Sequence, residues 1–335
     1  MHRFFLIGCL LLGLAACAPR LQSLGPEVGA PRLATEAVVT ADGLHLPLTK
    51  WPAAEERAVV VALHGFNDYR LSFATAAAWW AEHGVTTYAY DQRGFGQAPA
   101  PGIIGGAQAM AADARAVVAL AQARHAGKPV YLLGNSMGGA VALLALSGPE
   151  APAVDGLVLV APAVWGARAM SPFYRFGLWL WAHLTPGEYV TGRGLDRLAS
   201  DNIPMLRALG RDPLVIKKTR IDALYGLTKL MGAGLEAATA VDTPALVLYG
   251  ARDEIVPPAP VKEMAGTLNG VKRLALYADG WHMLLRDCQA ETVWRDVATW
   301  IADAAAPLPS GAEVDSPNAI NTSERGPVAE ACASA

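Results

Sequence analysis

The chain has 335 residues, a formal net charge of -3 and a sequence pI near 6.2, with no long run of Lys or Arg. The sequence therefore lacks the basic patch typical of nucleic-acid-binding proteins, and this class of function is excluded. Hydrophobic residues make up 53% and charged residues 17%, which excludes a disordered chain and predicts a folded protein with a well-filled core.

The N-terminus, MHRFFLIGCLLLGLAACAPR, has the pattern of an export signal: a basic start, an apolar run over 4–16, and small residues before Cys17. The run is short for a bilayer-spanning helix. The stretch LAAC, 14–17, is similar to the lipobox of bacterial lipoproteins. This resemblance implies that 1–17 is a signal ending at a lipidated Cys17, and that the protein is exported and tethered to a membrane. Ala18, in place of aspartate, implies the periplasmic side of an outer membrane; an ordinary signal with an incidental cysteine is the alternative.

A Pro- and Gly-bearing spacer, 18–33, follows and is expected to hold the domain off the membrane. Two β-rich runs around the turn signal ADG then predict a hairpin. From residue 58, near-continuous apolar runs alternate with helical segments, which predicts a parallel sheet covered on both faces. The predicted strands lie in 58–63, 85–90, 129–134, 155–161, 244–250 and 272–278, and the predicted helices over 72–82, 107–125, from 136, 260–268 and 290–304.

The alternation stops at 164–241, a stretch with helical patches rich in Trp, Phe, Leu and Met and no convincing strand. We therefore expect an α/β core, 34–163 and 242–305, interrupted by a helical cap. The last segment, 306–335, is polar and aperiodic and is expected to be a disordered tail. Cys288 and Cys332 are the two cysteines outside the signal region, and the sequence leaves their pairing open.

Chemically active side chains follow several of the predicted strands. In an open parallel sheet, ligands bind beyond the carboxyl ends of the strands. Ser136, within VYLLGNSMGGAVALL, Asp253 and His282 each follow such an end. A Gly-x-Ser-x-Gly match arises easily by chance in a glycine-rich chain, but an acid and a histidine downstream at the same edge indicate a catalytic triad.

Each triad member has rivals in the sequence. His282 is the only histidine after His183, which falls in the cap, and its alternative role is that of a structural loop residue. Asp253 follows a strand at the correct end. Asp279 and Glu254 remain weaker candidates for the acid.

The glycines around the serine fit a tight strand-to-helix turn, because minimal side chains at Gly134 and Gly138 let the two elements approach closely. The N–H of Met137 opens the helix and is one expected oxyanion donor. The N–H of Phe66, after the turn at Gly65, is the other. His64 and the pair Asp91 and Arg93 in DQRGFG are expected to be structural residues that fix these loops.

The motifs LHGF, DQRGFG, GNSMGG, LYGARDEIVP and GWHMLLRD, in this order, resemble the α/β-hydrolase superfamily. They are most similar to its branch of monoacylglycerol lipases and lysophospholipases. The resemblance implies an α/β-hydrolase fold, a Ser136–Asp253–His282 triad, oxyanion amides at Phe66 and Met137, and neither a cofactor nor a metal. Asn135 departs from the branch, which usually has histidine there, and GNSMGG also resembles carbon–carbon bond hydrolases.

The expected activity is hydrolysis of lipid-like esters through an acyl-enzyme on Ser136. Apolar segments of the cap, 173–184 and 225–235, are expected to form an acyl tunnel, with the cap's own core as the alternative. Trp281, beside the histidine, is expected to touch substrate. Other uses of the triad remain open, as a carbon–carbon bond hydrolase, an acyltransferase or an aminopeptidase, and a non-catalytic binding lipoprotein is a further alternative. An aminopeptidase needs acidic groups near its site, and the cap instead supplies Lys217, Lys218 and Arg220.

Overall fold

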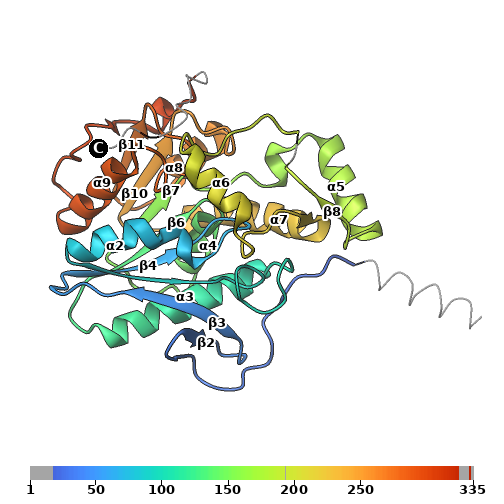
Figure 1. The fold of residues 1–335 in the computed structure, drawn as a ribbon, viewed down its shortest axis with the longest axis horizontal. Helices are drawn as coiled ribbons and strands as arrows, with labels where there is room; N and C mark the ends of the chain where they lie inside the picture. The colour runs from blue at the N-terminus through green and yellow to red at the C-terminus, as the bar shows by residue number, and fades with distance from the viewer. Residues whose placement is uncertain (1–17, 193, 324–331, 333–335) are drawn as a thin grey trace, which may run out of the picture.

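A ten-stranded, mostly parallel sheet forms the centre of the computed structural model, which describes residues 18–192, 194–323 and 332 (Figure 1). The strand order is β1-β2-β3-β5-β4-β6-β7-β10-β11-β12, and the six neighbouring strands β5, β4, β6, β7, β10 and β11 run parallel. The strands are β1 (Arg32–Leu33), β2 (Ala37–Val39), β3 (His45–Trp51), β4 (Ala58–Leu63), β5 (Val85–Tyr90), β6 (Val130–Asn135), β7 (Gly156–Val160), β10 (Ala245–Gly250), β11 (Lys272–Tyr277) and β12 (Glu313–Val314).

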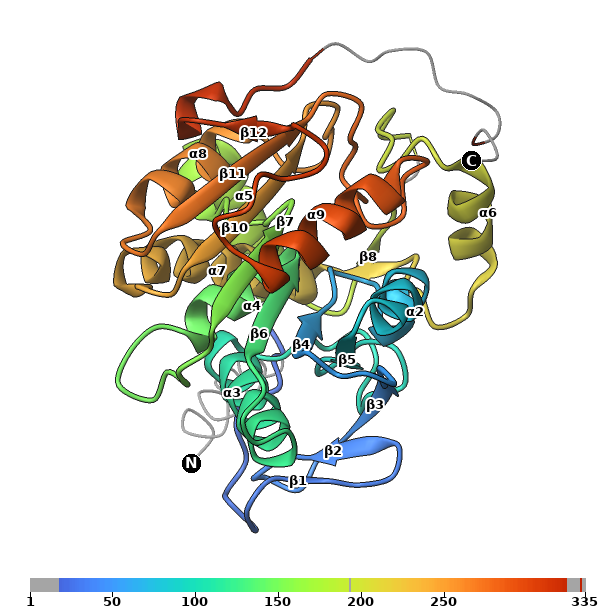
Figure 2. The same cartoon turned by 90° about the vertical axis from the view of Figure 1, so that its left-hand side faces the viewer.

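Helices cover both faces of this sheet, as the apolar strands require. On one face lie α3 (Ala107–Arg124), α4 (Met137–Ala145) and α8 (Pro258–Thr267); on the other lie α2 (Ala74–Glu82) and α9 (Ala290–Ala302) (Figure 2). Every residue of the central strands β4, β5, β6, β7 and β10 is buried. The mostly parallel sheet with helices on both faces that the sequence predicts is therefore confirmed.

The cap is inserted between β7 and β10. Its elements are α5 (Pro172–Leu184), α6 (Ile203–Arg211), α7 (Ile221–Ala237) and two short antiparallel strands, β8 (Tyr189–Val190) and β9 (Thr219–Arg220). The two strands are too short to leave a periodic signal, so the purely helical prediction missed them. Helix α7 crosses closely over α4, because Gly234 leaves room for Ala140.

The C-terminal segment is not the disordered tail that the sequence suggested, as far as residue 323. Strand β12 pairs antiparallel with β11, Leu308 and Ile320 are buried, and Cys332 forms a disulfide with Cys288. The edge strand β11 offers unpaired backbone groups to any nearby extended chain. The C-terminal segment pairs with these groups through its backbone and buries only a few apolar side chains. Its sequence therefore shows no periodicity from which the strand could be predicted.

The expected spacer, 18–33, also packs on the domain. Leu21 contacts the main core, Gln22 exchanges backbone hydrogen bonds with Ile104 and Gly106, and β1 pairs with β2. The predicted signal and Cys17 lie outside the described residues. Among the residues that are described, no helix is both long and apolar enough to cross a membrane.

Candidate active site

Ser136 stands on a strained turn between β6 and α4. Its backbone has φ of 52° and ψ of -117°, a conformation that residues other than glycine rarely adopt. A Cβ at Gly134 would collide with the backbone of Gly138, and a Cβ at Gly138 would collide with the carbonyl of Leu63. Only glycine at both positions allows the strand and helix to meet, and this turn lifts the hydroxyl to the sheet edge.

The structure brings together the three side chains that the sequence singled out. The Oγ of Ser136 lies 3.0 Å from Nε2 of His282, and Nδ1 of His282 lies 2.8 Å from Oδ2 of Asp253. The other oxygen of Asp253 accepts the N–H groups of Ile255 and Val256 at 2.8 and 2.9 Å. With Nδ1–H donated to the aspartate, Nε2 is left to accept the serine proton.

The two rival acids are engaged elsewhere. Asp279 is exposed and forms an ion pair with Arg252. The carboxylate of Glu254 accepts the N–H of Leu198, at 2.8 Å, from the cap. The geometry therefore favours Asp253 as the partner of the histidine.

Phe66 and Met137 line the same pocket as Ser136. Met137 begins α4, where the first N–H groups of a helix have no partner within the helix. Within the described part of the chain, neither the N–H of Phe66 nor that of Met137 donates a hydrogen bond. Both groups are thus free to donate to a substrate oxygen in this pocket, which is the role the sequence predicts for them.

His64 is fully buried and ties two sheet-edge loops together. It donates from Nδ1 to the carbonyl of Gly65, at 2.8 Å, and its Nε2 accepts the N–H of Gln92 at 3.0 Å. The side-chain amide of Gln92 returns to the carbonyl of His64 at 2.8 Å. Burial lowers the pKa of His64, so the ring is neutral and fixes the loop before Phe66.

Asp91 and Arg93 fix the neighbouring loop. Asp91 pairs with Arg70 at 2.6 Å, and the buried guanidinium of Arg93 lies between Asp42, at 2.8 Å, and Asp113, at 2.6 Å. The hydrogen bonds from Arg93 hold the pKa of the Asp42 carboxyl well below its ordinary value. These ion pairs anchor the loop to the hairpin and to α3.

A pocket of about 260 Å³ opens over the triad and is apolar on its cap side. Trp165, Leu227 and Met231 of the cap face it, although the sequence pointed only to the segment that holds the last two. Asn135 also lines the pocket, and its buried Oδ1 has no hydrogen-bond partner among the described residues. The lining residues are Gly65, Phe66, Asp68, Asn135, Ser136, Met137, Ala163, Trp165, Ala199, Leu227, Met231, Ile255, Val256, His282, Met283 and Arg286.

Trp281 was predicted to contact substrate, and this prediction is wrong. Its side chain is completely buried and does not line the pocket. Its backbone N–H donates to Asp287 at 2.7 Å. Adjacent residues on a turn point in different directions, so proximity to His282 in sequence did not place the indole beside it.

Sequence reasoning missed Asp287, which links the histidine loop to the cap. Besides the N–H of Trp281, its carboxyl accepts the hydroxyl of Ser200 at 2.6 Å, while Met283 donates its N–H to the carbonyl of Ala199 at 2.9 Å. Burial raises the pKa of Asp287 to about 7. The cap segment 197–202 thus contacts both triad loops, through Glu254 on one side and Asp287 on the other.

The fold, the serine on its strained turn and the hydrogen-bonded histidine and aspartate define the class as the α/β-hydrolases. The family model described as "Serine aminopeptidase, S33" matches residues 54–289, more than half of the chain, and the chain belongs to this family. Among the described residues, no group of three or more His, Cys, Asp or Glu side chains is placed to hold a metal ion.

Comparisons with known proteins point within this class to lipases. The chain is 26% identical to a monoacylglycerol lipase of Mycolicibacterium smegmatis over 266 residues, covering 77% of this chain and 93% of the relative. It is 24% identical to the monoglyceride lipase of Mus musculus, covering 85% and 99%. A solved structure of a soluble variant of monoglyceride lipase from Saccharomyces cerevisiae shares the fold, with a TM-score of 0.68, 21% identity and coverage of 83% and 97%.

Proposed function

We propose that this protein is a carboxylic ester hydrolase acting on lipids with one apolar acyl chain, such as monoacylglycerols, lysophospholipids or medium-chain acyl esters. The observation that carries the proposal is the Ser136–His282–Asp253 hydrogen-bonded series at the floor of a pocket whose cap side is apolar. The names of the monoacylglycerol and monoglyceride lipases to which the chain is similar support this substrate class.

The chemistry follows from the arrangement of the groups. His282 takes the proton of Ser136 as the serine oxygen attacks the ester carbonyl, and Asp253 stabilises the resulting imidazolium. The N–H groups of Phe66 and Met137 hold the oxyanion of the tetrahedral intermediate. The alcohol leaves with the proton from His282, and water then releases the acid from the acyl-enzyme by the same steps.

The polar lining favours an ester over a peptide whose free N-terminal amine must be bound in the site. Of the described residues that line the pocket apart from the triad, Asp68 alone carries a carboxylate, and it is paired with Arg286. Recognition of a free amine needs an unpaired acid. The unpartnered Oδ1 of Asn135 instead suits a hydroxyl donor, such as a glycerol group. An ester is therefore the better fit than the peptide that the family description names.

We also propose that the protein is exported and anchored through a lipidated Cys17, on the periplasmic side of an outer membrane. The disulfide between Cys288 and Cys332 supports export, since such bonds persist in oxidising compartments. Cys17→Ala is expected to move the protein from the membrane fraction to the soluble fraction. Unchanged partitioning of that variant would contradict the proposal.

The enzymatic proposal is tested by hydrolysis of acyl esters of graded chain length, including monoacylglycerol and lysophospholipid, beside Ser136→Ala. We expect activity that peaks at medium or long chains and vanishes in the variant. If a fluorophosphonate probe labels Ser136 but no ester is cleaved, the triad is active on another substrate class, such as a carbon–carbon bond. Absence of labelling would favour a binding protein without catalysis.

A further inference from the structure

Arg286 brings a positive charge to the wall of the triad pocket. It lies on the loop that follows His282, and its Nη2 forms an ion pair with the carboxylate of Asp68. An arginine side chain has five N–H donors. Among the described residues, Nε and Nη1 of Arg286 donate to no acceptor, and neither is one of the buried polar atoms that lack a partner. The guanidinium therefore has unused donors that are not sealed from the pocket.

A second arginine in the same chain shows what these donors can hold. Arg93 donates from Nη1 and Nη2 to Asp42, and from Nε and Nη2 to Asp113. One guanidinium thus serves two anions at once. Arg286 has one carboxylate, that of Asp68, and lines a cavity as well. A second anion in the pocket can therefore bind Arg286 without displacing Asp68.

The polar and apolar parts of the pocket lining come from different parts of the chain. Arg286 and Asp68 come from loops of the core, whereas the cap contributes Trp165, Leu227 and Met231. A charged group placed against the apolar cap residues would lose its hydration without a partner. A substrate with one apolar and one charged end is therefore oriented by this lining.

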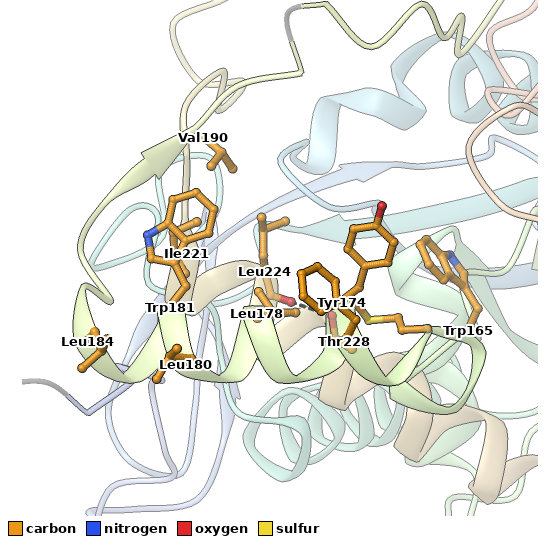
Figure 3. A pocket seen from close by; sticks show the side chains of 13 residues that line it. Trp165, Tyr174, Leu178, Leu180, Trp181, Leu184, Val190, Ile221, Leu224 and Thr228 are labelled. Carbon is orange, nitrogen blue, oxygen red and sulfur yellow. Dashed lines mark hydrogen bonds between the residues drawn. The ribbon is translucent and has the colours of Figure 1, made fainter.

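The apolar end of such a substrate has space beyond Trp165. This residue also lines a neighbouring apolar hollow of about 710 Å³ beneath α5. Figure 3 shows the hollow, with Trp165 at one end and Trp181 and Leu184 of α5 at the other. An acyl chain that extends past Trp165 leaves the core side of the triad pocket, with Arg286, to the alcohol part of the ester.

Among the lipid-like esters with one acyl chain, lysophospholipids carry an anion in that alcohol part. Their phosphate is attached to the same glycerol unit as the acyl ester, so one pocket can hold both groups. A guanidinium is suited to phosphate because its planar N–H groups match the phosphate oxygens. The glycerol unit also retains a free hydroxyl, which suits the unpartnered Oδ1 of Asn135.

We propose that Arg286 binds the headgroup phosphate of a lysophospholipid, and that Asp68 is the positioning residue that holds the guanidinium at the pocket wall. The inference rests on the proposed ester hydrolase function and chooses among its substrate classes. The acyl ester lies at Ser136, the acyl chain extends toward the hollow, and the phosphate accepts hydrogen bonds from Arg286. A monoacylglycerol enters the same pocket but leaves these donors to water.

The test compares two substrates with the same acyl chain in the same detergent micelles: palmitoyl lysophosphatidylglycerol and monopalmitoylglycerol. We expect Arg286→Gln to lower the ratio of their kcat/KM values, lysophospholipid over monoacylglycerol, about tenfold to a hundredfold. A general loss of folded enzyme lowers both activities and leaves the ratio unchanged. The variant Asp68→Asn with Arg286→Gln leaves no unpaired carboxylate behind, and we expect the same fall in the ratio.

Arg197→Gln is the matched control. Arg197 is an exposed arginine of the cap that donates to the carbonyl of Glu254 at 2.7 Å and lines a neighbouring cavity, not the triad pocket. We expect its ratio to stay within about twofold of the parent. An unchanged ratio in both Arg286 variants, or an equal fall in Arg197→Gln, would overturn the inference.

Inhibition of monopalmitoylglycerol hydrolysis separates a headgroup site from a site for free phosphate. We expect glycerol 3-phosphate to compete in the parent protein, and its inhibition constant to rise at least about tenfold in Arg286→Gln. Equal inhibition by inorganic phosphate would indicate a simple phosphate site and overturn the headgroup role.

Failure of the proposed function is distinguishable from failure of this inference. If neither ester is cleaved, the proposed ester hydrolase function is refuted, and the role of Arg286 is measured by fluorophosphonate labelling of Ser136. Protection of Ser136 by glycerol 3-phosphate in the parent but not in Arg286→Gln would still support the phosphate site. Absence of protection in the parent would refute both.

Discussion

The nucleophile turn and helix α5 of the cap follow opposite physical rules. Around Ser136 every residue of β6 and α4 is buried, and glycines are required because backbone presses on backbone. On α5 large aromatic residues face solvent, and Gly177 has no neighbour that an added Cβ would meet within 4 Å. The catalytic geometry therefore depends on close packing in the core, whereas the first helix of the cap leaves large apolar side chains exposed within the described part of the chain.

The largest expected effect concerns the acid of the triad. Asp253→Asn removes the charge that stabilises the imidazolium and favours the wrong tautomer of His282, so we expect kcat to fall about 10⁴-fold. Asp279→Asn removes only an exposed ion pair and serves as the control, with a change below about twofold. Steady-state kinetics on one soluble ester measures both. A larger loss in the Asp279 variant would reverse the assignment.

Gly138 in the nucleophile turn and Gly177 in α5 test the difference between the two regions through the stability of the protein. Gly138→Ala forces a Cβ against the Leu63 carbonyl, and we expect a loss of about 2–4 kcal/mol in the free energy of unfolding. Gly177→Ala lies on an exposed helix with open space around it and should be neutral or stabilising by up to about 1 kcal/mol. Denaturant titration distinguishes them. Equal effects would mean that the core turn is not as tightly packed as described.

The contact between core and cap through Asp287 can be tested by the pH dependence of the protein's stability. Its pKa is raised from 3.8 to about 7, so between these values the folded protein holds a proton that the unfolded chain lacks. The stability of the parent protein therefore falls as pH rises toward 8, by about 2 kcal/mol from pH 5 for this group. Asp201 raises and His282 lowers this pKa.

Asp287→Asn removes that titration while the amide can still bond Ser200 and the N–H of Trp281. We expect the melting temperature of the variant, relative to the parent, to rise by about 4 °C between pH 5 and pH 8. Asp279→Asn is again the control and should follow the parent in parallel. A difference in melting temperature that is constant with pH would show that Asp287 stays ionised in the fold.

The smallest expected effect concerns Trp165, the cap residue that lines both the triad pocket and the neighbouring hollow. Trp165→Ala widens the passage between the triad pocket and the hollow, and we expect kcat/KM for long-chain esters to change about tenfold relative to short-chain esters. Trp281→Phe, buried outside the pocket, should leave that ratio unchanged. The ratio is measured over a chain-length series. An altered ratio in the Trp281 variant alone would restore the prediction from sequence.

Much of the site followed from sequence because its determinants are local. Three features of the sequence place Ser136, Asp253 and His282 together: fully apolar strands, glycines at a tight turn, and strand ends that meet at one edge of the sheet. The same features indicate the loops that hold Phe66 and His64. Each of these inferences needs only the strand pattern and the geometry of a parallel sheet.

Other features depended on contacts between distant segments, and only the tertiary structure decided them. Contacts between segments far apart in the sequence determine five of these features. They are the burial of Trp281, the position of Trp165 at the site, the link between core and cap through Asp287, the packing of 18–33 and the pairing of β12 with β11. Sequence periodicity shows that a side chain is apolar, but it does not show what covers it. For that reason the sequence was enough to predict the catalytic class and the triad, while the packing of distant segments set the walls of the pocket and left the large apolar side chains of α5 exposed among the described residues.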